Sequence, residues 1–182
     1  LEAFILQAGP RGLFKKSTDI LTTGETAMYK LATQIPDGTV IGARGPYGVF
    51  APDNALNKWY AQTFKDRYSV LPNYAAYQMT QAILGTKAAW EKAQAANGGQ
   101  RPSADQVIAA FESSSFQSPA GTVSMALGKG HQALSGTAYG MTKLVDGKIT
   151  VTNVRYYPVE RVQPPEGMSS ADWIKSGMKP KK

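Results

Sequence analysis

The chain of 182 residues has no cysteine and only one histidine, His131. Without cysteine there is no thiolate nucleophile, no disulfide and no Cys-bound zinc or iron–sulfur cluster. One histidine is too few for a His-rich metal site, and no apolar run is long enough to be a membrane-spanning helix. These absences exclude most catalytic and metal chemistry, and they agree with a protein that binds rather than reacts.

A strong charge of one sign is also missing once the end of the chain is set aside. Lysine and arginine number 20 against 13 acidic residues, a net charge of +7, but residues 175–182 alone carry four lysines and no acid. A basic solvated tail explains this excess, and a polyanion site is the alternative. Nucleic-acid stacking needs aromatic and basic residues interleaved on one platform, which Arg44 and Tyr47 alone do not make. We therefore expect no nucleic-acid partner.

Hydrophobic residues make up 42% of the chain, enough for a packed core. The first part alternates: we expect a helix over 2–10, a strand over 18–22, a helix over 25–35 and a strand over 39–43. Such alternation indicates a parallel α/β sheet. The chain opens inside a helical pattern with no start signal and no leader, so we expect it to be a fragment.

Long helices are expected next, over 53–68 and 72–96, and a third begins at Ser103 with Gln106 in capping-box spacing. The first two carry apolar stripes that predict buried faces. These stripes are Leu56, Trp59, Tyr60, Phe64 and Tyr68, then Met79, Ile83, Thr86 and Trp90.

The pattern changes from Ser118 onward. A strand is expected over 122–127, and a hairpin joins 139–145 to 149–154 through Asp146-Gly147, a preferred two-residue turn. Ser169 is expected to cap a last short helix.

No motif points to catalysis or to a resident metal. Gly128-Lys129-Gly130-His131 lacks the spacing of a phosphate-binding loop and is interpreted as a turn. The aspartates fall mostly at turns and helix starts, without metal-ligand spacing, and no pair of carboxylates is singled out. We therefore predict no catalytic residue, no metal ligand and no cofactor.

Aromatic residues in loops are the better candidates for a binding role. Tyr47 and Phe50 lie in a Gly/Pro-rich loop after a strand, and Tyr74 and Tyr77 lie at the start of a helix. Ligands of α/β proteins bind at the carboxyl ends of strands, where such loops meet. Packing alone is the other explanation for these four side chains.

The order of several segments resembles the C-terminal half of a type I periplasmic substrate-binding protein of the branched-chain amino acid or amide transport group. The segments are Ala3-Phe4-Ile5-Leu6-Gln7-Ala8 with Gly12-Leu13; Asp37-Gly38-Thr39-Val40 with Gly45-Pro46-Tyr47; Trp59 to Tyr68 with Pro72, Tyr74-Ala75-Ala76-Tyr77 and Ala82-Ile83; and Pro119-Ala120-Gly121-Thr122-Val123 with Gly130-His131-Gln132 and the hairpin to Tyr157. Together they cover nearly the whole chain in order.

The resemblance implies two Rossmann-like α/β lobes that close on a small ligand, with the N-terminal part of lobe one missing here. Residues 1–47 would belong to lobe two and 48–130 to lobe one, and 131–182 would form a hinge crossing and the return to lobe two with the basic tail. Implied partners are a small-molecule ligand, the membrane permease of an ABC transporter and the missing N-terminal half. The implied location is the periplasm.

Ligand-binding positions also follow from the resemblance. The loop Thr22-Thr23-Gly24-Glu25 offers hydroxyl groups and a helix N-terminus that suit a carboxylate or carbonyl oxygen. Glu25 would bind a ligand ammonium, or instead complete a capping box with Thr22. Arg44, Tyr47, Tyr74 and Tyr77 are the other candidates; Arg44 would suit an acidic ligand or is simply exposed.

Three functional hypotheses remain open at this point, besides nucleic-acid binding through the lysine-rich tail, which deletion of the tail would test. Solute capture for transport, with an amino acid, amide or carboxylic acid as ligand, needs no catalysis and leads. A cytoplasmic ligand-sensing regulator of the same fold is the alternative, and a signal peptide ahead of Leu1 would distinguish the two. An enzyme working through Glu25 or His131 is the third.

Overall fold

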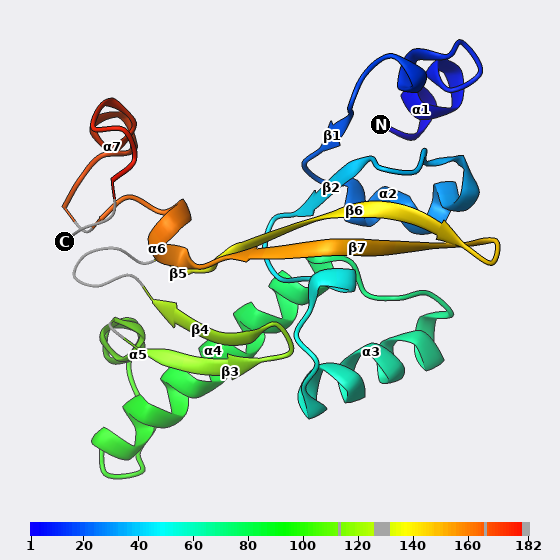
Figure 1. Ribbon diagram of the computed structural model, residues 1–182. Helices are drawn as coiled ribbons and strands as arrows, with labels where there is room; N and C mark the ends of the chain where they lie inside the picture. The colour runs from blue at the N-terminus through cyan, green and yellow to red at the C-terminus, as the bar shows by residue number, and fades with distance from the viewer. Residues whose placement is uncertain (113, 126–131, 166, 180–182) are drawn as a thin grey trace.

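The computed structural model describes residues 1–112, 114–125, 132–165 and 167–179 as a mixed α/β structure with two sheets (Figure 1). The helices are α1 (Glu2–Ala8), α2 (Gly24–Leu31), α3 (Ala55–Tyr68), α4 (Tyr74–Ala96), α5 (Ala104–Phe111), α6 (Val159–Val162) and α7 (Ser170–Lys175). The strands are β1 (Ile20–Leu21), β2 (Val40–Ala43), β3 (Ser115–Ser118), β4 (Gly121–Met125), β5 (Ala133–Leu134), β6 (Thr137–Val145) and β7 (Lys148–Tyr157). Short 3₁₀ turns follow as η1 (Leu13–Lys15), η2 (Ala32–Gln34) and η3 (Gly48–Phe50).

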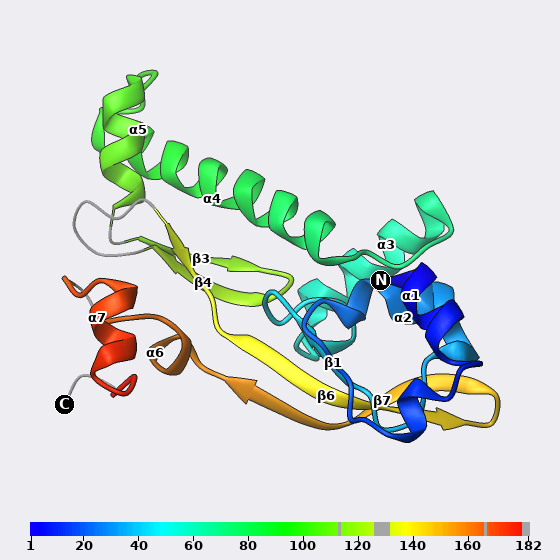
Figure 2. The same ribbon diagram turned by 90° about the horizontal axis from the view of Figure 1, so that it is seen from above.

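The first sheet has the strand order β1-β2-β6-β7. β1 and β2 are parallel, as the alternation predicts, whereas β6 pairs antiparallel to β2 and β7 antiparallel to β6. Asp146 and Gly147 have φ of 49° and 74°, so the predicted tight turn of the β6–β7 hairpin is confirmed. This long hairpin crosses most of the molecule (Figure 2), and its strand β6 lies beside β2.

The core of the molecule lies between this sheet and α2. Ile41 at the centre of β2 is 0% exposed, and the apolar face of α2 packs against it. At Gly24 a Cβ atom would come within 2.6 Å of Ile41 Cγ2, so only glycine lets α2 begin this close to the strand. The buried cluster consists of Ile5, Ala27, Met28, Leu31, Ile35, Ile41, Ala43, Phe50 and Ala138.

The predicted helix starts are largely confirmed. Asn54, Asn73 and Ser103 cap α3, α4 and α5 through their side-chain oxygens, and Gln106 completes the predicted capping box with Ser103. Such caps satisfy backbone N–H groups that the first helical turn leaves unpaired. The α4 helix begins at Tyr74, two residues later than predicted.

A second sheet has the order β3-β4-β5 and packs beside α4. The predicted strand 122–127 is observed as β4 up to Met125, and residues 126–127 lie outside the described residues. The strand β3 was not predicted. Its sequence Ser-Phe-Gln-Ser has only one apolar residue, and its pairing partner lies across the short turn at Pro119-Ala120. Partner strands rather than local propensity therefore create this strand.

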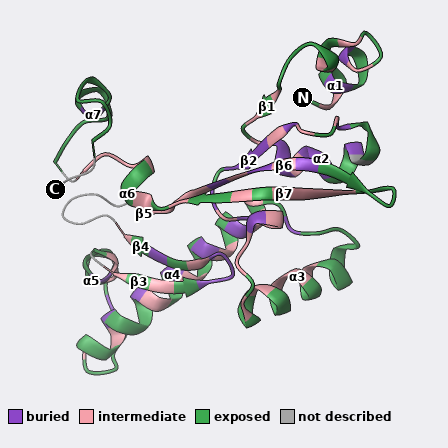
Figure 3. Cartoon of the chain, viewed as in Figure 1, coloured by how far each residue is buried: buried purple, intermediate pink, exposed green. Residues whose placement is uncertain are grey.

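The expectation that α3 and α4 bury their apolar stripes is wrong within the described residues. Trp59 of α3 is 63% exposed, and Met79 and Ile83 of α4 are 64% and 62% exposed. No residue of α3 is buried (Figure 3). The buried stripe of α4 is a different one, made of Tyr77, Gln81, Gly85, Ala89 and Ala93.

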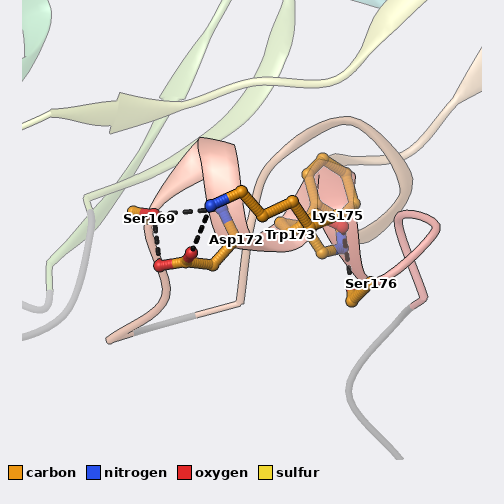
Figure 4. Close-up of polar contacts among 5 residues, drawn as sticks. All are labelled: Ser169, Asp172, Trp173, Lys175 and Ser176. Atoms are coloured by element: carbon orange, nitrogen blue, oxygen red, sulfur yellow. Dashed lines mark hydrogen bonds and ion pairs between the residues drawn. The ribbon is translucent and has the colours of Figure 1, made fainter.

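The predicted last helix is confirmed as α7, at the opposite end of the molecule from α1 (Figure 1). The Ser169 hydroxyl accepts a hydrogen bond from the Asp172 backbone N–H and donates one to the Asp172 carboxylate (Figure 4). Trp173 is only 5% exposed, and its Nε1–H donates to the Lys179 carbonyl at 3.0 Å. The segment therefore packs around its own tryptophan.

Candidate functional site at the carboxyl edge of strands β1 and β2

The strands β1 and β2 are parallel neighbours, and Ile20 of β1 pairs with Val40 of β2. Their carboxyl ends therefore meet at one edge of the first sheet. Thr22 and Thr23 follow β1 there, and Arg44 follows β2. Thr22 and Arg44 are exposed and Thr23 is half-buried. The structure therefore places these predicted residues at the edge where α/β proteins bind ligands.

Glu25 lies behind this edge and is 1% exposed. The capping-box interpretation of Glu25 is wrong, because α2 begins at Gly24 and Glu25 is therefore its second residue instead of its third. The third position is taken by Thr26, whose hydroxyl donates to the Thr23 carbonyl at 3.0 Å. Oε1 of Glu25 has no hydrogen-bond partner within the part of the chain that the structure describes. Burial raises the Glu25 pKa to about 7, against a smaller opposing effect of the Tyr74 backbone N–H.

The predicted tyrosines come together on the other side of the Arg44 loop. The rings of Tyr47 and Tyr77 stack with centroids 5.6 Å apart, and Tyr60 meets Tyr77 edge-on at 5.0 Å. The Arg44 guanidinium lies over the Tyr74 ring, 4.9 Å from its centroid, in a cation–π contact. Tyr47 and Tyr77 are 2% and 1% exposed, so they form a buried wall and do not reach the surface.

A chain of buried polar groups fixes this wall. The Tyr47 hydroxyl donates to Gln81 Oε1 at 3.1 Å, and Gln81 Nε2 donates to Ser118 Oγ at 3.3 Å. The Tyr77 hydroxyl donates to Asn57 Oδ1 at 2.7 Å. Burial raises the pKa of Tyr47, and hydrogen bonds with Ser135, Gln78 and Gln81 offset part of that rise. Both phenols are therefore neutral hydrogen-bond donors at physiological pH.

A cavity of about 490 Å³ opens beside this wall, between α4, the β3–β4 hairpin and the loop that carries Arg44. Arg44 is the one charged residue among the described residues that line it, and Phe111 and Phe116 add aromatic surface. The remaining lining residues are Tyr47, Gln78, Gln81, Ala82, Thr86, Val123, Met125, Gln132, Ala133, Ser135 and Gln163. A single cation with amide and hydroxyl groups suits a small carboxylate with an apolar body.

Two predicted residues, Arg44 and Tyr47, line this cavity, whereas Thr22, Thr23, Gly24, Glu25, Tyr74 and Tyr77 do not. The sequence reasoning missed Gln78 and Gln81. Each lies four residues after a predicted tyrosine, Gln78 after Tyr74 and Gln81 after Tyr77, and therefore on the same side of α4. This spacing could have identified both residues from the sequence. Ser135 carried no such signal, because the second sheet alone brings it to Tyr47.

Within the part of the chain that the structure describes, no group of three or more His, Asp or Glu side chains could hold a metal ion. Nor does any helix there have the length and apolarity needed to cross a bilayer. The predicted turn Gly128-Lys129-Gly130-His131 lies outside the described residues.

No family model and no curated protein matches this sequence. Solved structures, however, share its fold. A solute-binding protein of an ABC transporter from Rhodopseudomonas palustris, in complex with 3,4-dihydroxybenzoic acid, has a TM-score of 0.66 at 21% identity, over 87% of this chain and 42% of that one. Another from Rhodopseudomonas palustris, in complex with 4-hydroxybenzoate, has a TM-score of 0.65 at 18% identity, over 92% and 42%.

A leucine-binding protein from Thermotoga maritima is also similar, with a TM-score of 0.58 at 15% identity, over 84% of this chain and 41% of that one. The chain therefore has the fold of type I periplasmic binding proteins, as the resemblance of its segments implies. It spans about two fifths of the length of these solved structures.

Proposed function

We propose that the chain is part of the solute-binding component of an ABC transporter, which captures a small polar or aromatic ligand between two lobes for uptake through a membrane permease. The observation that carries the proposal is the cavity beside the carboxyl-edge loops, because Arg44 is the one charged residue among the described residues that line it. The proposal assigns the chain no catalytic step, since hinge closure around a solute requires none.

The ligand class that this cavity favours is a carboxylic acid with an aromatic or apolar body. Arg44 would pair with the carboxylate, and Phe111 and Phe116 would contact the ring. An amino acid would also need an anion for its ammonium group, but Glu25 is not among the residues that line the cavity. Two of the similar proteins were solved with hydroxylated benzoic acids, which agrees with this class, whereas the third is a leucine-binding protein.

We further propose that the rest of the fold comes from an N-terminal half of the same protein and that the whole acts in the periplasm. The exposed stripes of α3 and α4 support this, because apolar helix faces of this size normally pack against a sheet. The solved structures are more than twice as long as the part that this chain matches. A cytoplasmic sensor of the same fold is distinguished from a transport protein by the absence of a signal peptide ahead of Leu1.

Isothermal titration calorimetry on the chain joined to this N-terminal half tests the proposal, with benzoate, 4-hydroxybenzoate and leucine as probes. We expect the two aromatic acids to bind and leucine not to. Arg44→Gln should weaken the binding of the acids about tenfold or more, because a charge-assisted pair is lost. The control is Arg101→Gln, the same change at an exposed position ahead of α5. Equal affinities of the two variants, or no binding of either acid, would contradict the proposal.

A further inference from the structure

Glu25 is unusual among the described residues because it is the one charged side chain in the buried interior. It lies in the first turn of α2 and is 1% exposed, and its Oε1 atom has no hydrogen-bond partner among the residues described. A buried carboxylate normally has a cation or several donors beside it. None of the ion pairs among the described residues includes Glu25.

The groups that interact with this carboxyl come from three elements. From α2 itself there is the phenol of Tyr29, and from α4 there are the phenol of Tyr77 and the backbone N–H of Tyr74. From η3 there is the backbone of Gly48, where a Cβ atom would collide with Glu25 Oε1. Gly48 is therefore in direct contact with the carboxyl, and η3 brings no titratable side chain.

These neighbours suit the neutral acid better than the carboxylate. Burial raises the pKa of both phenols, and the Glu25 charge adds to the rise, so both stay neutral and neither supplies a positive charge. The Tyr74 N–H favours the ionised form, but burial outweighs it and raises the Glu25 pKa to about 7. An ionised carboxyl would have to move toward water, and Gly48 and the start of α4 lie against it.

We propose that Glu25 is a proton-operated latch that fastens the first turn of α2 to Gly48 and to the N-terminus of α4. When Glu25 is protonated, its side chain stays in its buried position, and α2 remains in contact with Gly48 and the start of α4. The ionised side chain leaves that position, and the start of α4 separates from α2. Because that same turn of α4 carries Tyr74, which holds Arg44, the latch regulates the geometry of the candidate ligand site; this last consequence alone rests on the proposed function.

Urea unfolding between pH 5 and pH 9 tests the latch in the chain as it stands. The native state holds a proton that the unfolded chain releases near pH 4.5, so stability falls as the pH rises toward about 7 and is level above it. In that range the Glu25 contribution lowers the folding constant about tenfold per pH unit. Glu25→Gln, a neutral side chain of the same shape, should remove this component and be the more stable protein at pH 8.

The matched control is Glu2→Gln in α1, which removes an exposed acid whose Oε1 is 3.6 Å from Lys30 Nζ. It should keep the pH dependence of the unmodified chain. If Glu25→Gln and Glu2→Gln change with pH in the same way, the latch is refuted.

Nuclear magnetic resonance on the unmodified chain gives a second reading that needs no variant. The carboxyl carbon of Glu25 should titrate near pH 7, and the hydrogen-exchange protection of the Tyr74 amide should fall over the same range. Titration near pH 4.5, or protection of Tyr74 that does not follow the titration, overturns the proposal. Neither measurement uses a ligand, so a failure of the calorimetry described above would leave the latch standing.

Discussion

The α2 helix and the α4 helix carry similar apolar stripes, yet only the first stripe is buried. Met28 and Leu31 of α2 are 1% and 4% exposed, whereas Met79 and Ile83 of α4 are 64% and 62% exposed. The stripe of α2 packs against β2, which is the strand that follows α2 in the sequence and lies parallel to β1. A helical stripe thus predicts that a face will be buried, but it does not say whether the layer that buries it lies in the same segment.

The largest effect in this comparison is expected when an isoleucine is replaced by alanine in each of the two regions. Ile41→Ala removes a fully buried side chain from β2 and should lower the free energy of unfolding by about 4 kcal/mol. Ile83→Ala removes an exposed one from α4 and should change it by less than about 0.5 kcal/mol. Urea denaturation of both variants measures the difference, and equal losses would break the comparison.

A glycine at the junction of the two regions should give the next largest effect. Gly48 has φ of 57°, and a methyl group there would collide with Glu25, so Gly48→Ala should cost about 3 kcal/mol. Gly98→Ala is the matched control: φ is 61°, and no described residue other than its chain neighbours has an atom within 4 Å of the added methyl. It should cost about 1 kcal/mol, from the backbone alone. Thermal unfolding checks both, and similar losses would show that the α2–η3 contact is loose.

The polar wall of the candidate site should contribute less. Tyr47→Phe leaves Gln81 without its donor in a buried position and should cost about 1.5 kcal/mol. Tyr156→Phe, at a tyrosine that is 58% exposed, should be close to neutral. Chemical denaturation of the pair measures the buried hydrogen bond. A neutral Tyr47→Phe would mean that packing alone holds the wall.

The smallest effect is expected at the start of α5, which is part of the α4 region. Ser103→Ala removes one half of an exposed capping box and should cost about 1 kcal/mol. Ser124→Ala, at an exposed serine of β4, serves as the control. The loss of helical circular dichroism on heating gives the measurement. No difference between the two variants would show that α4 packing alone determines α5.

Local signals account for what was predicted correctly. The Asp146-Gly147 turn, the caps at Ser103 and Ser169 and the length of α4 depend on residues close in sequence, so a pattern of a few residues contains the whole cause. The predicted capping box of Thr22 and Glu25 is wrong because α2 begins one residue later than that pattern indicates. The close approach of Gly24 to Ile41 sets this start. That approach involves residues far apart in sequence.

The sequence by itself determined α1 to α5, α7, the hairpin and the parallel pair of β1 and β2, though not α6, and the order of its segments pointed to the fold of periplasmic binding proteins. It also proposed Arg44 and Tyr47 as ligand-binding candidates, and both line the cavity. Only the tertiary structure decided that Glu25 is buried with no hydrogen-bond partner for its Oε1 atom among the described residues, that Gln81 joins Tyr47 to Ser118, and which helix faces stay exposed. The physical reason is that burial and hydrogen bonding depend on which distant segments meet. A periodic pattern identifies the face of one segment, but it does not identify the segment that packs against that face.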